Sequence, residues 1–496
     1  MQVPFRRMRL FLIVLAAGLL FSIPAMAHNV TIGGFGGAGN STNGSFVNHV
    51  WTPSGDSNLD FEDLLAEMAG SNVEIITNGS GHITVNPTLT YTGVTNRQLT
   101  LSAQGDITLN GIHSTNAALS VIANAAGIVN VGGASVITNS GSFTSSGTDF
   151  STISSQMNTG GGSFTLNHSG TVLITAGGAT TGGGAFASSG TGFTVTSSGL
   201  RTVGGNVVLN HSGAVIINNG GLQTGGGTFT SSGTDFTTSD TGVDTSSGDA
   251  VLNHTGTVYI GGSGVQTGGG AFTSSGIGFT ATDGGVRTGG GNAVLNHTGT
   301  VSLISNGVDT AGGSFTSSGT DFTATGNGVR TGGGNAVLNH TGDVDVSGGI
   351  FTSGGNCNIN SSASASFSLN GIRTSGGNIL VQSNGLIYVN AGPTVLSGES
   401  QIDGGHIALR SATGITADGI ISSESGTGGN LYLEGDTSAI VLNVYPELGA
   451  GNITLYVGVL SPPSTPIPTL SEWGIIIFSL LLAGSAIWMM RRRQVS

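Results

Sequence analysis

The sequence predicts an all-β fold: a right-handed parallel β-helix (solenoid) of about 21–22 residues per coil, with an N-terminal capping helix and a C-terminal transmembrane helix. Three features predict it. The 496-residue chain contains 90 glycines and only 7% charged residues, which suits a fold built on turns. Hydrophobic residues make up 37% of the chain, enough to form a core. Its central part repeats with a constant period of 43 residues.

The charge composition excludes several classes of function. All 12 basic residues are arginine. Between His28 and Pro466 there are six arginines and 24 acidic residues, a net charge of −18. Such a body is expected to repel anionic polymers, and nucleic-acid binding is not expected. The single cysteine, Cys357, cannot form an intrachain disulfide, and no cysteine–histidine cluster suggests zinc. We therefore predict no cofactor and no metal site.

Residues 1–27 have the pattern of a secretory signal peptide. Three arginines precede an apolar run over residues 10–23, and the small residues Ala25 and Ala27 follow as the expected cleavage site. The alternative is an uncleaved anchor helix, for which the apolar run is short.

Residues 28–72 form an N-terminal segment with a predicted capping helix over residues 58–70. Asn58 is the expected N-cap, and acidic residues follow in the first turn. The apolar residues recur at helical spacing: Phe61, Leu64, Leu65 and Met68. We expect this amphipathic helix to cover the open end of the solenoid, which would otherwise expose strand edges and core.

Residues 141–349 contain five repeats, and each is predicted to form two coils. Three sets of residues recur every 43 positions: Phe143, Phe186, Phe229, Phe272 and Phe315; Phe150, Phe193, Phe236, Phe279 and Phe322; His168, His211, His254, His297 and His340. Each repeat has two similar halves that open with glycines and close on a Gly-hydrophobic-x-Thr turn, so the true unit is one coil. A propeller would need four dissimilar strands, and a leucine-rich repeat would need helix-compatible segments. Further coils are expected over residues 73–140 and 350–460.

Side-chain packing accounts for the two coils per repeat. When one half is laid on the other, Phe315 faces Ala293 and His297 faces Gly319. Close-packed interiors require large and small residues to alternate in this way. We predict that every large residue faces a small one, and that each of the five histidines lies beside a glycine of each adjacent coil. The right hand follows from the usual crossover rule.

The repeated polar residues are interpreted as structural. The histidines could suggest a metal ladder, but positions two coils apart are separated by about 9.6 Å, too far to share an ion. Asp149, Asp235 and Asp321 recur only in alternate repeats, so no calcium site is predicted. Five asparagines begin N-x-S/T sequons but are interpreted as a turn-stabilising ladder: Asn167, Asn210, Asn253, Asn296 and Asn339.

The C-terminal end has the pattern of a membrane-inserted tail. A Pro/Ser linker over residues 461–466 leads into residues 467–496, where an apolar run over residues 475–490 is just long enough to span a bilayer. The distinctive residues are Ile467, Pro468, Thr469, Leu470, Trp473 and Gly474 before this run, and the basic stop Arg491, Arg492 and Arg493 after it. A plain anchor would explain the helix and the arginines but not the motif before them.

This tail closely resembles the IPTL-CTERM class of bacterial sorting signals, which are relatives of PEP-CTERM tails. The resemblance implies an exosortase-type enzyme that recognises the motif on the outer side of the inner membrane and processes the tail. It also implies a Gram-negative bacterium that makes exopolysaccharide, with the body delivered to the cell envelope, the cell surface or the extracellular matrix.

The body resembles the coils of filamentous-haemagglutinin-type exoproteins, in segments such as residues 99–111 and 376–381. This resemblance covers roughly residues 70–460 and implies a β-helix and a role as an adhesin or matrix protein. The chain departs from that family because it lacks a recognisable two-partner secretion signature, and the sorting tail takes its place.

We expect a non-enzymatic role, because catalysis needs dissimilar groups in one constellation and the repeats present the same face again and again. The expected partners are an exosortase-type enzyme, the inner membrane, and extracellular polysaccharide or other cell surfaces. One alternative is a glycan- or ice-binding face of outward Ser/Thr rows. The other is a polysaccharide lyase or hydrolase with a site in the flanks, around His49 and His82 or among Glu399, Asp403, His406 and Arg410.

Overall fold

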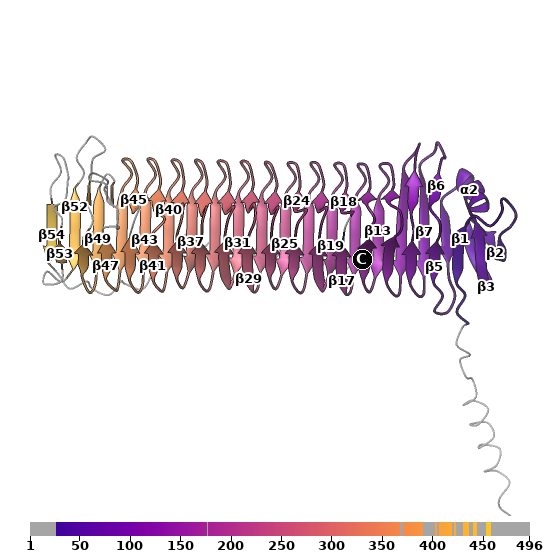
Figure 1. The fold of residues 1–496 in the computed structure, drawn as a ribbon, viewed down its shortest axis with the longest axis horizontal. Coiled ribbons are helices and arrows are strands. Elements are labelled where there is room, and N and C mark those ends of the chain that lie inside the picture. Colours follow the sequence, from indigo (N-terminus) through magenta and orange to yellow (C-terminus); the bar gives the residue numbers. More distant parts are fainter. Residues whose placement is uncertain are drawn as a thin grey trace, which may run out of the picture.

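The computed structural model describes residues 26–175, 177–367, 371–389, 402–403, 406–418, 421–422, 430–435, 440–443 and 453–457. They form a long rod of stacked coils, a parallel β-solenoid (Figure 1). The signal peptide up to Ala25, the linker, the sorting motif and the transmembrane helix lie outside these residues, whereas Ala27 is described and exposed.

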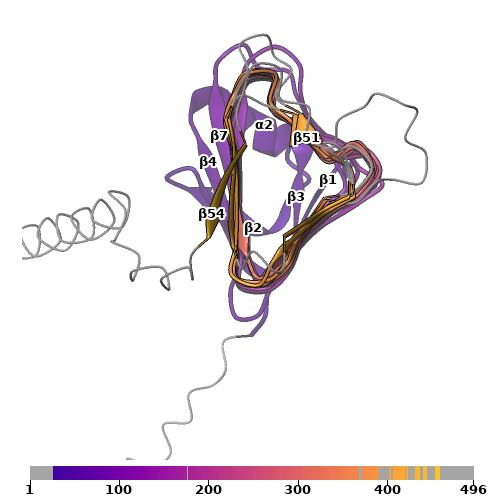
Figure 2. The same cartoon turned by 90° about the vertical axis from the view of Figure 1, so that its left-hand side faces the viewer.

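Each coil has three strands around a triangular cross-section (Figure 2). In the first repeat they are β13 (Phe143–Gly147), β14 (Phe150–Ile153) and β15 (Met157–Asn158). The first two kinds of strand belong to a 38-stranded sheet, and the short third kind forms a 16-stranded sheet. The predicted all-β solenoid is therefore confirmed.

The coils stack in parallel with the predicted length. Phe143 of β13 lies opposite Phe164 of β16 (Phe164–His168), and Phe164 lies opposite Phe186 of β19 (Phe186–Gly190), so successive coils hold 21 and 22 residues. This stacking pairs backbone N–H and C=O groups with the coils on either side. The right hand of the solenoid stays a prediction.

The short strands of the 16-stranded sheet were expected to be turns. In the repeats each begins at the hydrophobic residue of a Gly-hydrophobic-x-Thr sequence, except β15, where Gln156 replaces the glycine. The threonine that follows each strand is buried. Thr224 shows the reason: its hydroxyl donates to the carbonyl of Gly227, and its N–H donates to the carbonyl of Asp244 one coil further on (2.9 Å). These bonds hold the hydrophobic residue and x in an extended conformation. The hydrophobic residue therefore points into the core, and x points outward.

The strands of this sheet are β6 (Leu89–Tyr91), β9 (Ile112–Ser114), β12 (Val136–Ile137), β15, β18 (Ala179–Thr180), β21 (Leu200–Arg201), β24 (Leu222–Gln223), β27 (Val243–Asp244), β30 (Val265–Gln266), β33 (Val286–Arg287), β36 (Val308–Asp309), β39 (Val329–Arg330), β42 (Ile350–Phe351), β45 (Ile372–Arg373), β48 (Ile402–Asp403) and β51 (Ile421–Ser422).

The N-terminal segment joins the same stack. Strand β1 (Val30–Gly33) pairs in parallel with β3 (Val50–Asp60) and with β5 (Ile83–Val85), while β2 (Thr42–Val47) pairs with β3 in antiparallel fashion. The predicted helix is α2 (Phe61–Gly70), which lies at the N-terminal end of the rod (Figure 1). Leu64 and Met68 face the core. That α2 closes this end stays a prediction.

The expected N-cap of α2 was wrong. Asn58 belongs to β3, where it lies opposite Thr31, so its backbone is committed to the sheet. Asp60 caps the helix instead, and its Oδ1 accepts a hydrogen bond from the Glu62 N–H (2.9 Å).

The predicted alternation of large and small core residues holds only in part. In the second phenylalanine column each phenylalanine faces a valine, as Phe279 faces Val301. In the first column the alternation holds in the later repeats. Phe272 lies between Ala250 and Ala293 in the neighbouring coils. It fails in the first repeat, where Phe164 stands between Phe143 and Phe186, and all three are buried. Their ring centroids are 5.2 and 5.1 Å apart in edge-to-face contact, which lets three large rings share one column.

Candidate functional site

Side chains on this rod form rows along its axis, because each position of the coil recurs about 4.8 Å further on. A functional surface of the repeats is therefore a line of similar groups. A constellation of dissimilar groups needs the flanking coils, where the sequence varies.

The five repeated histidines form a buried row. They end strands β16, β22 (Val207–His211), β28 (Ala250–His254), β34 (Ala293–His297) and β40 (Ala336–His340), and their exposed fractions are only 3–5%. Each lies opposite a glycine of the preceding coil, as His297 does opposite Gly276. The predicted glycine is thus confirmed in the preceding coil. In the following coil His340 lies opposite Ser361, so the prediction of a glycine on both sides is wrong there. A Cβ on Gly276 would lie 2.5 Å from the carbonyl oxygen of Gly256 and 3.5 Å from Nδ1 of His297, so the close approach of the backbone, more than the ring, requires glycine there.

The histidine row is neutral at pH 7. Each Nε2 lies 3.1 Å from a serine hydroxyl of the preceding coil, for example Ser274 for His297, and each ring tilts against a phenylalanine. In the part of the chain that the structure describes, the buried Nδ1 atoms have no hydrogen-bond partner. Burial lowers the pKa of all five to about 4. The described residues hold no group of three His, Cys, Asp or Glu side chains that could bind a metal.

The repeated asparagines lie on the outer face of the same strands, not in turns as expected. The Oδ1 of Asn253 in β28 accepts a hydrogen bond from the Ser275 hydroxyl of the next coil (2.9 Å), and Asn210 and Asn296 pair in the same way with Ser232 and Ser318. The coil between two asparagines carries serine at this position, so the result is an asparagine–serine ladder that links adjacent coils.

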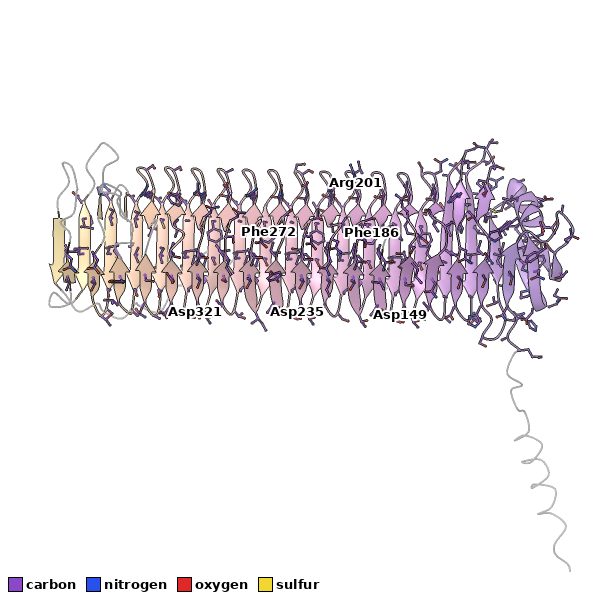
Figure 3. All side chains as sticks on the ribbon, in the orientation of Figure 1. Asp149, Phe186, Arg201, Asp235, Phe272 and Asp321 are labelled. Carbon is purple, nitrogen blue, oxygen red and sulfur yellow. The ribbon has the colours of Figure 1, made fainter. Side chains whose placement is uncertain are left out.

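The repeated aspartates line one long edge of the rod. Figure 3 shows Asp149, Asp235 and Asp321 along this edge. The Oδ1 of Asp235 accepts hydrogen bonds from the N–H and the hydroxyl of Thr257 in the next coil (2.7 and 3.0 Å), and Asp149 does the same with Thr171. These carboxylates therefore hold the turns of successive coils together.

The flanking candidates fall into separate pairs. His49 contacts Glu67 of α2 (2.5 Å), and His82 lies 3.3 Å from the Asp106 carboxylate. Arg410 pairs with Glu434 (3.2 Å).

His406 accepts a hydrogen bond from the Asn430 N–H (3.2 Å). Glu399 and the side chain of Asp403 lie outside the described part of the structure.

Sequence reasoning missed a row of arginines. Arg201, Arg287, Arg330 and Arg373 each occupy the x position of Gly-hydrophobic-x-Thr, which the 16-stranded sheet turns outward. Interpreting that sequence as a turn hid the row. The sequence nevertheless contains a signal for this row, because four arginines occur at the same position of the coil.

The sorting residues Ile467, Pro468, Thr469, Leu470, Trp473 and Gly474 and the basic stop Arg491, Arg492 and Arg493 lie outside the described residues. Within the described part, no helix is long and apolar enough to cross a membrane.

Comparison with known families identifies an IPTL-CTERM motif at residues 465–493. No curated protein and no solved structure matches the chain. The motif confirms the predicted sorting signal, and it implies an exported protein sorted to the cell envelope or surface, with processing by an exosortase-like enzyme in general.

Proposed function

We propose that this protein is a non-enzymatic, adhesin-like structural rod of a bacterial cell surface, processed by an exosortase-type enzyme and associated with an exopolysaccharide or biofilm matrix. The observation that carries the proposal is the order of the chain: an IPTL-CTERM motif at residues 465–493 follows a continuous β-solenoid.

The solenoid supports a structural role. Its core is continuous from coil to coil, and every coil pairs in parallel with its neighbours, so bending the rod would strain many backbone hydrogen bonds at once. Its outward rows repeat the same groups at a fixed interval, which favours many weak contacts with an extended partner.

Processing of the tail is the first part to test. Trp473→Ala and Pro468→Ala alter the motif but leave the apolar run and the arginines intact, and Ser464→Ala in the linker is the matched control. After cell fractionation, both motif variants should accumulate at the inner membrane with the tail retained, while the control should reach the surface. A wild-type distribution of the motif variants would refute sorting through the motif.

Intact mass spectrometry of protein recovered from the surface tests processing at both termini of the chain. The expected mass lacks the signal peptide and reports removal or exchange of the tail. A full-length chain at the surface would refute processing.

The non-enzymatic part has its own test. Purified protein should leave acidic polysaccharides intact. Turnover that is lost on Arg410→Ala would overturn this part in favour of a lyase or hydrolase.

A further inference from the structure

Four of the six arginines between His28 and Pro466 lie in one outward row, the arginine row. It consists of Arg201, Arg287, Arg330 and Arg373, which share the second position of the short strands β21, β33, β39 and β45. Arg201, Arg287 and Arg330 are exposed, whereas the apolar residue before each is buried. On a body with a net charge of −18, this clustering concentrates positive charge on one face.

Three members of the arginine row are exposed, and one of them, Arg330, is also oriented. Arg373 is only partly exposed, and its Nε is buried. The Arg330 guanidinium lies 5.1 Å from the ring centroid of Phe351 in the next coil, and this cation–π contact restrains it. Among the described residues, Arg201, Arg287 and Arg330 form no ion pair. The turns beside the row leave space for a ligand, because a Cβ added to Gly290 or Gly333 would meet no atom within 4 Å.

Aspartates also occupy the arginine row. Asp403 lies in register with Arg373 in the next coil. Asp309 lies in register between Arg287 and Arg330, and its Oδ1 accepts a hydrogen bond from the Ala311 N–H (3.1 Å). Asp244 lies further along the same row and accepts from the Ser246 N–H (2.8 Å). Asp240 and Asp283 lie in the turns before β27 and β33.

The repeated aspartates lie elsewhere. Figure 3 places Asp149, Asp235 and Asp321 along the long edge opposite that of Arg201. These three carboxylates are therefore kept away from the arginine row.

We infer that the arginine row binds an acidic polysaccharide that carries one carboxylate per disaccharide. Arg287 and Arg330 are separated by two coils, about 9.6 Å, which is the length scale of one extended disaccharide. A guanidinium binds a carboxylate through two parallel hydrogen bonds. The inference rests on the proposed function and deepens it, because it names the surface and the ligand class of the matrix association.

Hyaluronan, with one carboxylate per disaccharide, is a suitable probe for the full-length chain in detergent. We expect binding in low salt, little binding to neutral dextran or double-stranded DNA, and weakening as salt rises. The double variant Arg287→Gln/Arg330→Gln should lose about tenfold or more in affinity. Asp309→Asn should bind more tightly, because it removes the negative charge between the two arginines. Arg410→Gln, which removes the same charge outside the row, is the matched control.

Two results would overturn the inference: unchanged hyaluronan binding by the double variant, or an equal loss in Arg410→Gln. Tighter binding to DNA than to hyaluronan would also overturn it. An unchanged circular dichroism spectrum and melting temperature show that the variants fold.

The inference and the proposed function can fail separately. The row variants should still reach the cell surface, because the sorting motif is intact. The Trp473→Ala variant should be mislocalised in cells but still bind hyaluronan once purified.

Discussion

Lowering the pH from 7 to 5 should destabilise the solenoid through its buried histidines. Their pKa is about 4 in the folded state, against an ordinary value of 6.5. Above pH 6.5 the rings are neutral in both states and the effect is absent. Between these values the unfolded chain binds protons that the folded chain does not, so the free energy of unfolding falls as the pH falls. Below about pH 4 the loss is complete.

The expected magnitude is large. At pH 5 the two pKa values give a loss of ~2 kcal/mol per histidine, or ~10 kcal/mol for the row of five if the sites are independent. The geometry agrees with this value. A protonated ring would have to place a charged Nδ1–H where the described structure offers no acceptor, beside a phenylalanine ring.

Guanidinium chloride unfolding at pH 7 and pH 5, followed by far-UV circular dichroism, measures the loss. His254→Gln removes one titrating ring and should reduce the pH dependence of the unfolding free energy by about one fifth. His406→Gln, at an exposed position outside the row, is the matched control. Equal pH dependence in the wild type and His254→Gln would refute the reasoning, as would full stability of the wild type down to pH 4.

Three further predictions concern packing. Gly319→Ala should cost about 1–3 kcal/mol, because the added methyl would lie 2.3 Å from the Gly299 carbonyl, whereas Gly192→Ala meets its nearest atom at 3.6 Å and should melt like the wild type. Phe272→Ala should cost about 3–5 kcal/mol, because the alanines on either side cannot fill the space, and a wild-type melting temperature would contradict this. Burial raises the pKa of the Cys357 thiol to about 12, so mass spectrometry should detect iodoacetamide labelling only in denaturant, and rapid labelling of the native protein would count against the fold at that position.

The stacking of the coils was predictable from the sequence because two independent patterns agree. The period of 43 residues sets which coils are equivalent, and the size alternation of Phe315 with Ala293 sets their register. The position of each histidine opposite a glycine of the preceding coil followed from the same register.

Other features depend on geometry that composition does not reveal. Phe164 breaks the size alternation, because edge-to-face contact accommodates a third ring in one column. The N-cap moved from Asn58 to Asp60, because β3 pairs with β1 up to residue 60. The arginine row depends on a two-residue strand, and its pairing with neighbouring coils turns one residue of each short segment outward.

The two ends of the rod differ in their distance along the chain from the sorting segment. The sorting segment follows β54 (Ile453–Val457), which lies at the end opposite α2 (Figure 1). A partner that binds the sorting segment is therefore connected to the β54 end of the rod. The opposite tip, with Glu62, Asp63 and Glu67 on α2, is carried about 75 Å away by some 16 coils. In the proposed role, the rod would act as a spacer of set length that presents its acidic tip outward.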